Sequence, residues 1–107
     1  MTIGAPVRGQ IYRADIGHGA KPWLIVSNNR RNRELSRVLA VRITSTDKFA
    51  SLPTMVPLST ADPLVGHIAT DDVQQLRRDE LTVLLGTVSP ATIMAVNTAL
   101  KLALAIP

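Results

Sequence analysis

The sequence contains no cysteine and only three aromatic residues, one each of tryptophan, tyrosine and phenylalanine. The absence of cysteine excludes disulfides, thiolate metal sites and a thiol nucleophile. The shortage of aromatics argues against a sheet that stacks several RNA bases on aromatic rings. The longest apolar stretch, near the C-terminus, is interrupted by Asn97, Thr98 and Lys101 and is too short and polar to span a bilayer. Because no secretory signal is visible at the N-terminus either, we expect a cytoplasmic protein with no membrane segment.

The length and composition predict one small domain. The chain has 107 residues, without an internal repeat, a low-complexity tract or a linker, so residues 1–107 are expected to fold as a single unit. Hydrophobic residues make up 46% of the sequence, which is generous for a domain of this size. Part of this apolar surface is therefore expected to close against a second copy of the chain, as a homodimer.

Positive charge is concentrated in the first half of the chain. Residues 1–48 hold nine Lys and Arg against three Asp and Glu, whereas residues 49–107 hold three against five. A basic half of this kind suits a polyanionic partner, because Lys and Arg release phosphate counterions on binding. A solvated, solubilising surface has the same composition, so charge alone leaves both interpretations open.

The pattern of short β-favouring runs predicts a mainly β fold. Runs rich in Val, Ile, Leu and Thr alternate with clusters of Gly, Pro, Asn and Asp, which is typical of a barrel or sandwich. We predict strands over residues 9–15, 23–27, 38–45, 54–58, 67–70 and 81–88. Residues 28–36 form a polar segment rich in Arg and Asn, within which residues 28–33 are predicted to be a mobile loop.

A helix is predicted to close the chain. Ser89 is a suitable N-cap, and Pro90 suits the first helical position, where its missing N–H costs nothing. Apolar residues then recur at helical spacing, at Ile93, Val96, Leu100, Ala103 and Leu104. We expect this stripe to pack on the sheet, while Met94 and Leu102 widen the apolar face toward a second subunit.

Three short motifs resemble those of the MazF/PemK family of toxin endoribonucleases. They are Arg8-Gly9-Gln10-Ile11-Tyr12, Lys21-Pro22-Trp23-Leu24-Ile25-Val26-Ser27-Asn28 and Ile43-Thr44-Ser45, and the resemblance runs from Arg8 to the C-terminus. It implies a small SH3-like β-barrel with a C-terminal helix, forming a homodimer. The family cleaves single-stranded RNA across the dimer groove without a metal or other cofactor, leaving a 2′,3′-cyclic phosphate and a 5′-hydroxyl. It also implies a protein partner, an antitoxin whose C-terminal segment occupies the same surface.

The resemblance and the strand pattern together indicate three catalytic candidates. Lys21 stands where the family usually has Arg before the proline, so it supplies a point charge rather than a planar fork. Thr44 occupies the position of the family's catalytic threonine, where a hydroxyl donates to the scissile phosphate. His18, in a Gly17-His18-Gly19 loop, has a side chain suited to proton transfer. Each has an ordinary structural interpretation as well: a solvated lysine, an edge-strand threonine and an exposed loop histidine.

Further residues are candidates for RNA binding. Strand alternation places Arg42 on the same face as Thr44. The predicted contacts are Arg13, Arg42, Ser45, Thr46, Asp71, Arg30 and Arg31. Arg30 and Arg31 are expected to clamp phosphates from a mobile loop. Asp71 matches an acidic position of the family, whereas Asp72 stands where Gln is usual; both are expected in a turn. No group of His, Asp and Glu shows metal-ligand spacing, so no metal is expected.

Two other functions remain open from the sequence. The CcdB-type gyrase inhibitors are built on a related barrel, but they end in Trp-Gly-Ile, whereas this chain ends in Ala105-Ile106-Pro107 and has its only tryptophan at position 23. A non-catalytic RNA-binding module is the other alternative, because the change from Arg to Lys at position 21 weakens the match to the catalytic pattern.

Overall fold

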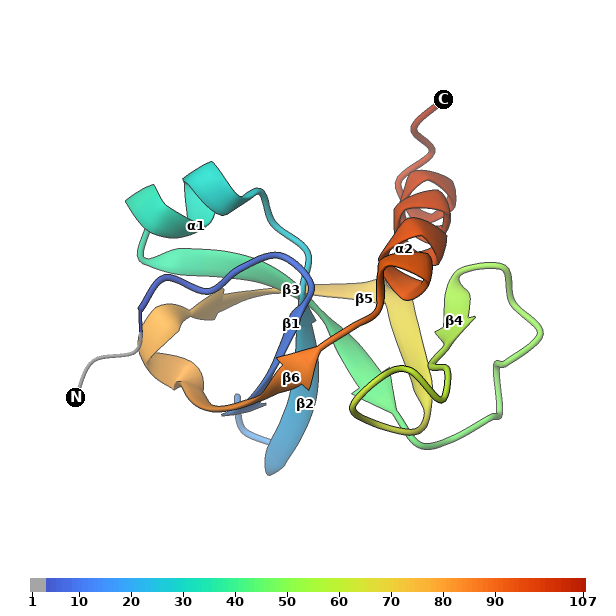
Figure 1. Ribbon diagram of the computed structural model, residues 1–107, viewed down its shortest axis with the longest axis horizontal. Helices are drawn as coiled ribbons and strands as arrows, with labels where there is room; N and C mark the ends of the chain where they lie inside the picture. Colours follow the sequence, from blue (N-terminus) through green and yellow to red (C-terminus); the bar gives the residue numbers. More distant parts are fainter. Residues whose placement is uncertain (1–3) are drawn as a thin grey trace.

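The computed structural model describes residues 4–107 as a curled β-sheet with two helices packed on it (Figure 1). In chain order the elements are β1 (Gln10–Asp15), β2 (Ala20–Ile25), α1 (Asn29–Glu34), β3 (Arg37–Thr44), β4 (Met55–Pro57), β5 (His67–Arg77), the 3₁₀ turn η1 (Arg78–Glu80), β6 (Leu81–Thr87) and α2 (Pro90–Ala103). Within the described range, no helix is long and apolar enough to cross a membrane.

All six strands belong to one antiparallel sheet in the order β4-β5-β3-β2-β1-β6. The prediction of a mainly β fold with a C-terminal helix is confirmed. The sheet curls as the barrel fold requires, but its hydrogen-bonded ladder is open, with β4 and β6 at the two edges of the described sheet. The predicted strands correspond to observed ones, although most bounds differ by a residue or more.

The two faces of the sheet bury separate hydrophobic clusters, and β3 contributes to both. Val41 and Ile43 belong to a cluster that includes Val96 and Ala99 of α2. Ala40 and its same-face neighbours belong to a second cluster inside the curl of the sheet, together with Trp23. Because successive strand residues point to opposite faces, this double burial fixes the register of β3. It also fixes which face carries Arg42 and Thr44.

The C-terminal helix begins as predicted. Ser89 is the N-cap, and its Oγ accepts a hydrogen bond from the Thr92 N–H at 3.2 Å. Val96 is fully buried against the sheet, whereas Leu104 lies beyond the last helical residue and is 57% exposed. The predicted stripe is therefore correct at its centre and wrong at its C-terminal end.

The segment predicted as a mobile loop contains a helix. Asn28 caps α1 by accepting from the Arg30 N–H at 2.8 Å. Asn32 is fully buried, and its Nδ2 donates to the Ser27 carbonyl at 3.0 Å, which ties the helix to the chain just after β2. The expectation of a loop over residues 28–33 is wrong, because the short helix α1 is stabilised by polar caps rather than by an apolar stripe.

Strand β5 is also longer than predicted. It extends to Arg77, so Asp71 and Asp72 lie within a strand and not in a turn. The pairing with β3 shifts between Val41 and Arg42, whose partners are Val73 and Ala69. The extra residues of β5 at this point form a bulge, which bends the strand and redirects its side chains.

Candidate functional site

Two neighbouring hollows lie at one end of the sheet and share Lys21 and Arg42. The first has a volume of about 350 Å³ and is called the Trp23 hollow; it is lined by Ile16, His18, Gly19, Lys21, Trp23, Arg42, Asp72 and Gln74. The second has a volume of about 320 Å³ and is called the Thr44 hollow; it is lined by Lys21, Pro22, Arg42, Ile43, Thr44, Ser45, Leu64 and Val65. The structure therefore gathers all three predicted catalytic residues in one region.

Strand pairing explains why these residues meet. Trp23 of β2 lies directly opposite Arg42 of β3. Lys21 is two residues before Trp23, and Thr44 is two residues after Arg42, so all four side chains belong to the same face of the antiparallel pair. Two cations and a hydroxyl thus come from the ends of adjacent strands, where the sheet stops and the backbone leaves room for a ligand.

The Thr44 hydroxyl can both accept and donate hydrogen bonds, and its oxygen already accepts one. Its Oγ accepts from the Thr46 N–H at 3.2 Å, which places Thr46 beside Thr44 as an orienting residue. A hydroxyl has one proton to donate, and here an accepted bond on its oxygen limits how the group rotates. The Thr44 proton is thus available for an acceptor in the hollow, such as a phosphate oxygen.

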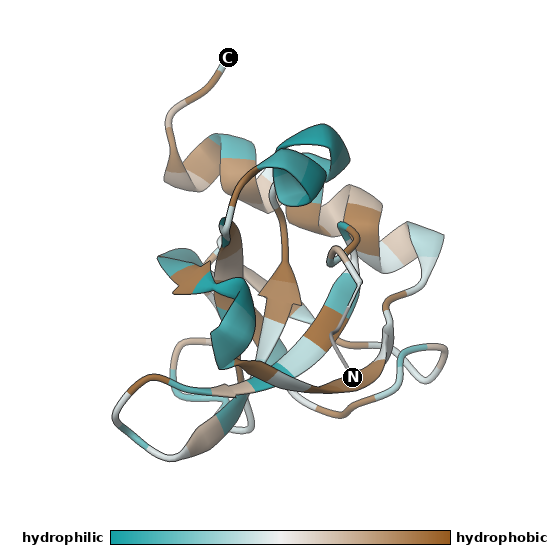
Figure 2. Cartoon of the chain, turned by 90° about the vertical axis from the view of Figure 1, so that its left-hand side faces the viewer, coloured by the Kyte–Doolittle hydropathy of each residue, from teal (hydrophilic) through white to brown (hydrophobic). Residues whose placement is uncertain are grey.

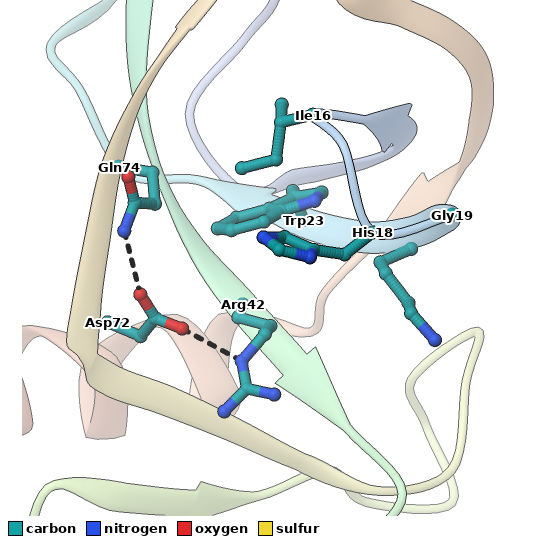
Figure 3. Close-up of a pocket in the computed structure, with 8 residues that line it drawn as sticks. Ile16, His18, Gly19, Trp23, Arg42, Asp72 and Gln74 are labelled. Atoms are coloured by element: carbon teal, nitrogen blue, oxygen red, sulfur yellow. Dashed lines mark hydrogen bonds and ion pairs between the residues drawn. The ribbon is translucent and has the colours of Figure 1, made fainter.

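Arg42 is held by an acidic partner from β5. Its Nε donates to Asp72 Oδ2 at 2.8 Å, and Gln74 Nε2 donates to Asp72 Oδ1 at 3.0 Å (Figure 3). Both carboxylate oxygens are therefore engaged. The bond through Nε leaves the two terminal nitrogens of the guanidinium, which are the ones suited to grip a phosphate.

His18 and Trp23 form the wall of the Trp23 hollow. Figure 3 shows the imidazole of His18 beside the indole of Trp23. Trp23 is 4% exposed and its Nε1 has no hydrogen-bond partner in the described structure. The exposed His18 is thus brought to a surface that also carries Lys21 and Arg42.

Comparison with known proteins identifies the family. Residues 7–104 match the family described as PemK-like, MazF-like toxin of type II toxin–antitoxin systems. The chain belongs to this family. It is 51% identical to the endoribonuclease MazF4 of Mycobacterium tuberculosis over 98% of each chain.

Two solved structures of mycobacterial endoribonucleases agree with this assignment. One, determined in complex with its cognate antitoxin, is 52% identical, superposes with a TM-score of 0.93, and the match covers 96% of this chain and 98% of that one. The other is 48% identical, with a TM-score of 0.91 and coverage of 100% and 98%. The mainly β fold with a C-terminal helix that the MazF/PemK resemblance implies is thus confirmed, with a sheet that, over the described residues, is not closed into a barrel.

Several predicted RNA contacts of this MazF-family chain lie outside the two hollows. Arg13 is exposed and sits opposite Pro22 and Val83 of its neighbouring strands. Asp71 accepts a hydrogen bond from the Thr54 hydroxyl and lines neither hollow. The structure therefore brings together Lys21, Thr44, His18, Arg42 and Ser45, and leaves Arg13 and Asp71 apart from them.

Arg30 and Arg31 are on α1, next to the start of β3, whereas Thr44 is the last residue of β3. Their predicted role as a loop clamp over the site is wrong, because the segment is helical and lies at the other end of the strand (Figure 1).

Several residues that line the hollows are not among the site residues predicted from the sequence. Asp72 and Gln74 come from the unpredicted half of β5, and Leu64 and Val65 come from the loop before it. The charge pair of Arg42 with Asp72 spans 30 positions, so no local spacing indicates it. Val65 carries a signal in the sequence, since it is an apolar residue in a turn segment; it is 95% exposed beside the site.

Among residues 4–107, no group of three or more His, Cys, Asp or Glu side chains is placed to hold a metal ion. Positive charge in the two hollows comes instead from Lys21 and Arg42.

Proposed function

We propose that this chain is the endoribonuclease toxin of a type II toxin–antitoxin pair and cleaves single-stranded RNA without a metal. The observation that carries the proposal is the meeting of Lys21, Arg42 and Thr44 at one hollow. Cationic groups and a donating hydroxyl are what a phosphate needs when negative charge builds up on its oxygens during cleavage. The endoribonuclease name of relatives at 51% identity supports the same activity.

In the proposed reaction, the 2′-hydroxyl of one nucleotide attacks the adjacent phosphorus and the 5′-oxygen of the next nucleotide leaves. The products are a 2′,3′-cyclic phosphate and a 5′-hydroxyl. Arg42 and Lys21 stabilise charge on the phosphate oxygens, and Thr44 donates a hydrogen bond to one of them. His18, in the adjoining Trp23 hollow, is the candidate for moving a proton to or from the reacting oxygens.

We also propose a cytoplasmic homodimer restrained by an antitoxin. The support for an antitoxin is the related mycobacterial endoribonuclease, whose structure contains its cognate antitoxin. The support for a dimer is the apolar surface left uncovered on α2, where Met94 is 68% exposed and Leu102 is 54% exposed. An acidic segment of a partner protein that entered the hollows would meet the same two cations that bind RNA.

The test is incubation of the purified protein with a long single-stranded RNA in EDTA, followed by mapping of new 5′ ends. We expect discrete cuts, a fall on the order of 100-fold in cleavage rate for Thr44→Ala, and substantial activity in Thr44→Ser, which keeps the donor. Lys21→Ala should also cut slowly, whereas Lys101→Ala removes an exposed lysine far along α2 and serves as its control.

RNA that is bound but left intact by the wild-type protein would contradict the proposal and favour the RNA-binding module. Intact RNA together with inhibition of gyrase supercoiling would favour the CcdB-like alternative instead.

A further inference from the structure

Six of the nine arginines gather at the end of the sheet opposite the two hollows. They come from α1, the start of β3, the end of β5 and η1, and we call them the arginine face: Arg30, Arg31, Arg33, Arg37, Arg77 and Arg78. In the sequence, the arginines from Arg30 to Arg37 are some forty residues away from Arg77 and Arg78. Only the fold brings these two groups together.

The contacts between these segments are direct. Arg37 of β3 lies opposite Arg77 of β5 in the antiparallel register. Arg31 Nη1 donates to the Arg37 carbonyl at 3.2 Å, and the Arg78 N–H donates to the Ser36 carbonyl at 2.9 Å. Figure 2 faces this side of the molecule and shows α1 and η1 as hydrophilic segments turned toward the viewer.

Acidic side chains neutralise only part of this charge. Glu34 pairs with Arg30 at 3.3 Å, while Asp79 and Glu80 both pair with Arg77, at 3.3 and 3.7 Å. Within residues 4–107, no ion pair is formed by Arg31, Arg33, Arg37 or Arg78.

Arg37 lies across from Arg77 in the ladder, and because Asp79 and Glu80 pair with Arg77, the charge of Arg37 is the one left uncompensated there. Solubility alone does not require arginine, whose planar fork binds phosphate oxygens in pairs.

The arginine face is far from the place of cleavage. Arg37 is the first residue of β3 and Thr44 is the last, a separation of about 23 Å at the usual rise of a strand. At a rise of about 3.4 Å per stacked nucleotide, roughly seven nucleotides cover that distance. An RNA that reaches both places must extend well beyond the scissile phosphate.

We propose that the arginine face is a second RNA-binding site, which holds backbone phosphates away from the cleaved bond and favours long or folded RNA over short oligonucleotides. The inference rests on the proposed ribonuclease function and adds a substrate class to it. Arginines that contact phosphates position the RNA without reading its bases, so the face sets affinity and not the cleavage sequence.

The composition of the surface favours RNA over an acidic protein. Protein interfaces are built around a buried apolar or aromatic centre. In the described segments that carry the six arginines, Leu35 is the single large hydrophobic residue that is exposed, at 48%. A broad cationic surface with so little apolar area matches a phosphate backbone.

The test compares two RNAs that share one cleavage site, one of about five nucleotides and one of about thirty, chosen to fall below and above the roughly seven-nucleotide span. Arg33→Gln/Arg37→Gln is the test variant, because neither side chain makes a hydrogen bond or ion pair in the described structure and its loss should not disturb folding. Arg37→Gln and Lys101→Gln are a matched pair of single variants. The first removes one positive charge from the arginine face, and the second removes one from α2.

Binding is measured by fluorescence anisotropy in a Thr44→Ala background, so that the result does not depend on cleavage. For the long RNA we expect the double variant to bind on the order of tenfold more weakly at low salt, with the salt slope reduced by about 1.4, as for two lost phosphate contacts. The short RNA should bind the parent and the double variant with equal affinity. Lys101→Gln should bind both the short and the long RNA as tightly as the parent does.

If the double variant lost the same affinity for the short and the long RNA, the proposal would be overturned. It would also be overturned if the variant lost affinity for neither. Weaker binding of an acidic peptide with unchanged RNA binding would also overturn it, in favour of a protein partner. Cleavage is measured separately with Thr44 intact: a protein that binds long RNA through this face but cuts neither RNA would refute the ribonuclease function alone, so the two failures are distinguishable.

Discussion

Arg42 depends on a carboxylate thirty residues further along the chain. Asp72 fixes the guanidinium through Nε and is itself fixed by Gln74, so the arginine approaches a phosphate in one orientation. Lys21 has no such partner among the described residues and is exposed, which makes it the adaptable cation of the pair. The substitution of Lys for the family's Arg at position 21 thus leaves Arg42 as the only arginine fork in the two hollows.

Replacement of Asp72 by Asn should lower kcat/KM about fivefold, because a partly exposed ion pair contributes about 1 kcal/mol to positioning. The readout is the cleavage rate of a short RNA at several substrate concentrations. Asp79→Asn is the matched control, since it removes a carboxylate that pairs with an arginine outside the hollows. An Asp72→Asn enzyme as fast as the parent would show that Arg42 does not act through its orientation.

The part of the site that the sequence predicted is the part encoded locally. Lys21, Arg42 and Thr44 were assigned from short motifs and from the two-residue alternation of strands, and the structure places them together. The sequence predicts Asp72 in a turn and not as the partner of Arg42, because that role depends on the register of β3 against β5 and on a bulge. Neither has a local signature, so no reading of the sequence near Arg42 would have found this partner.

At the scale of elements, the loop between β4 and β5 is anchored to the start of α2. Asp62 accepts from the Ser59 and Ser89 N–H groups, both at 2.7 Å, and from the Thr92 hydroxyl at 2.7 Å. The same loop carries Val65 into the wall of the Thr44 hollow. The position of that wall therefore depends on a carboxylate that never touches the hollow.

The anchor should make the fold sensitive to acid. Burial acts to raise the pKa of Asp62, but the hydrogen bonds from Ser89, Thr92 and Ser59 outweigh it and lower the pKa from 3.8 to about 2. A lowered carboxyl pKa stabilises the folded state fully above pH 3.8, and this contribution is lost as the pH falls toward 2. It amounts to at most about 2 kcal/mol.

Urea unfolding at pH values from 7 down to 2 tests this. Asp62→Asn should be less stable at pH 7 and should lose less stability than the parent between pH 4 and pH 2. Asp47→Asn removes an exposed carboxylate that makes no side-chain bond in the described structure, and it is expected to follow the parent. Parallel acid profiles for the parent and Asp62→Asn would show that the anchor does not govern acid stability.

The elements that the sequence did not predict are those stabilised by polar or distant contacts. Helix α1 has six residues, of which three are arginines, so it presents no apolar stripe and no helical periodicity. Its stability comes from the Asn28 cap and from the buried side chain of Asn32. The β-strands and α2 were predicted because each buries an apolar face whose spacing is visible in the sequence.

At the scale of the whole molecule, the described chain leaves a large apolar surface uncovered. On α2 and the residues after it, Met94, Leu102, Leu104 and Ile106 are each more than half exposed. The edge strand β6 adds Val83 and Leu84, each 49% exposed. Exposed apolar residues that gather on one element, as on α2 and the residues after it, are typical of a surface that contacts another protein.

We expect a second copy of the chain to cover the α2 surface, so Leu102→Glu should shift the protein from dimer to monomer. The charged side chain would lose hydration in the interface without gaining a partner, which favours the separated subunits. Sedimentation at several concentrations measures the change, and X-ray scattering adds a second check, because the Cα radius of gyration of one chain is 13.0 Å.

Met94→Glu tests the same surface at a second position, and Val65→Glu, which adds a charge beside the Thr44 hollow, is the control expected to remain dimeric. A parent protein that sediments as a monomer at high concentration, or a Leu102→Glu and Met94→Glu pair that both stay dimeric, would show that α2 is not the contact and that the uncovered surface belongs to another partner.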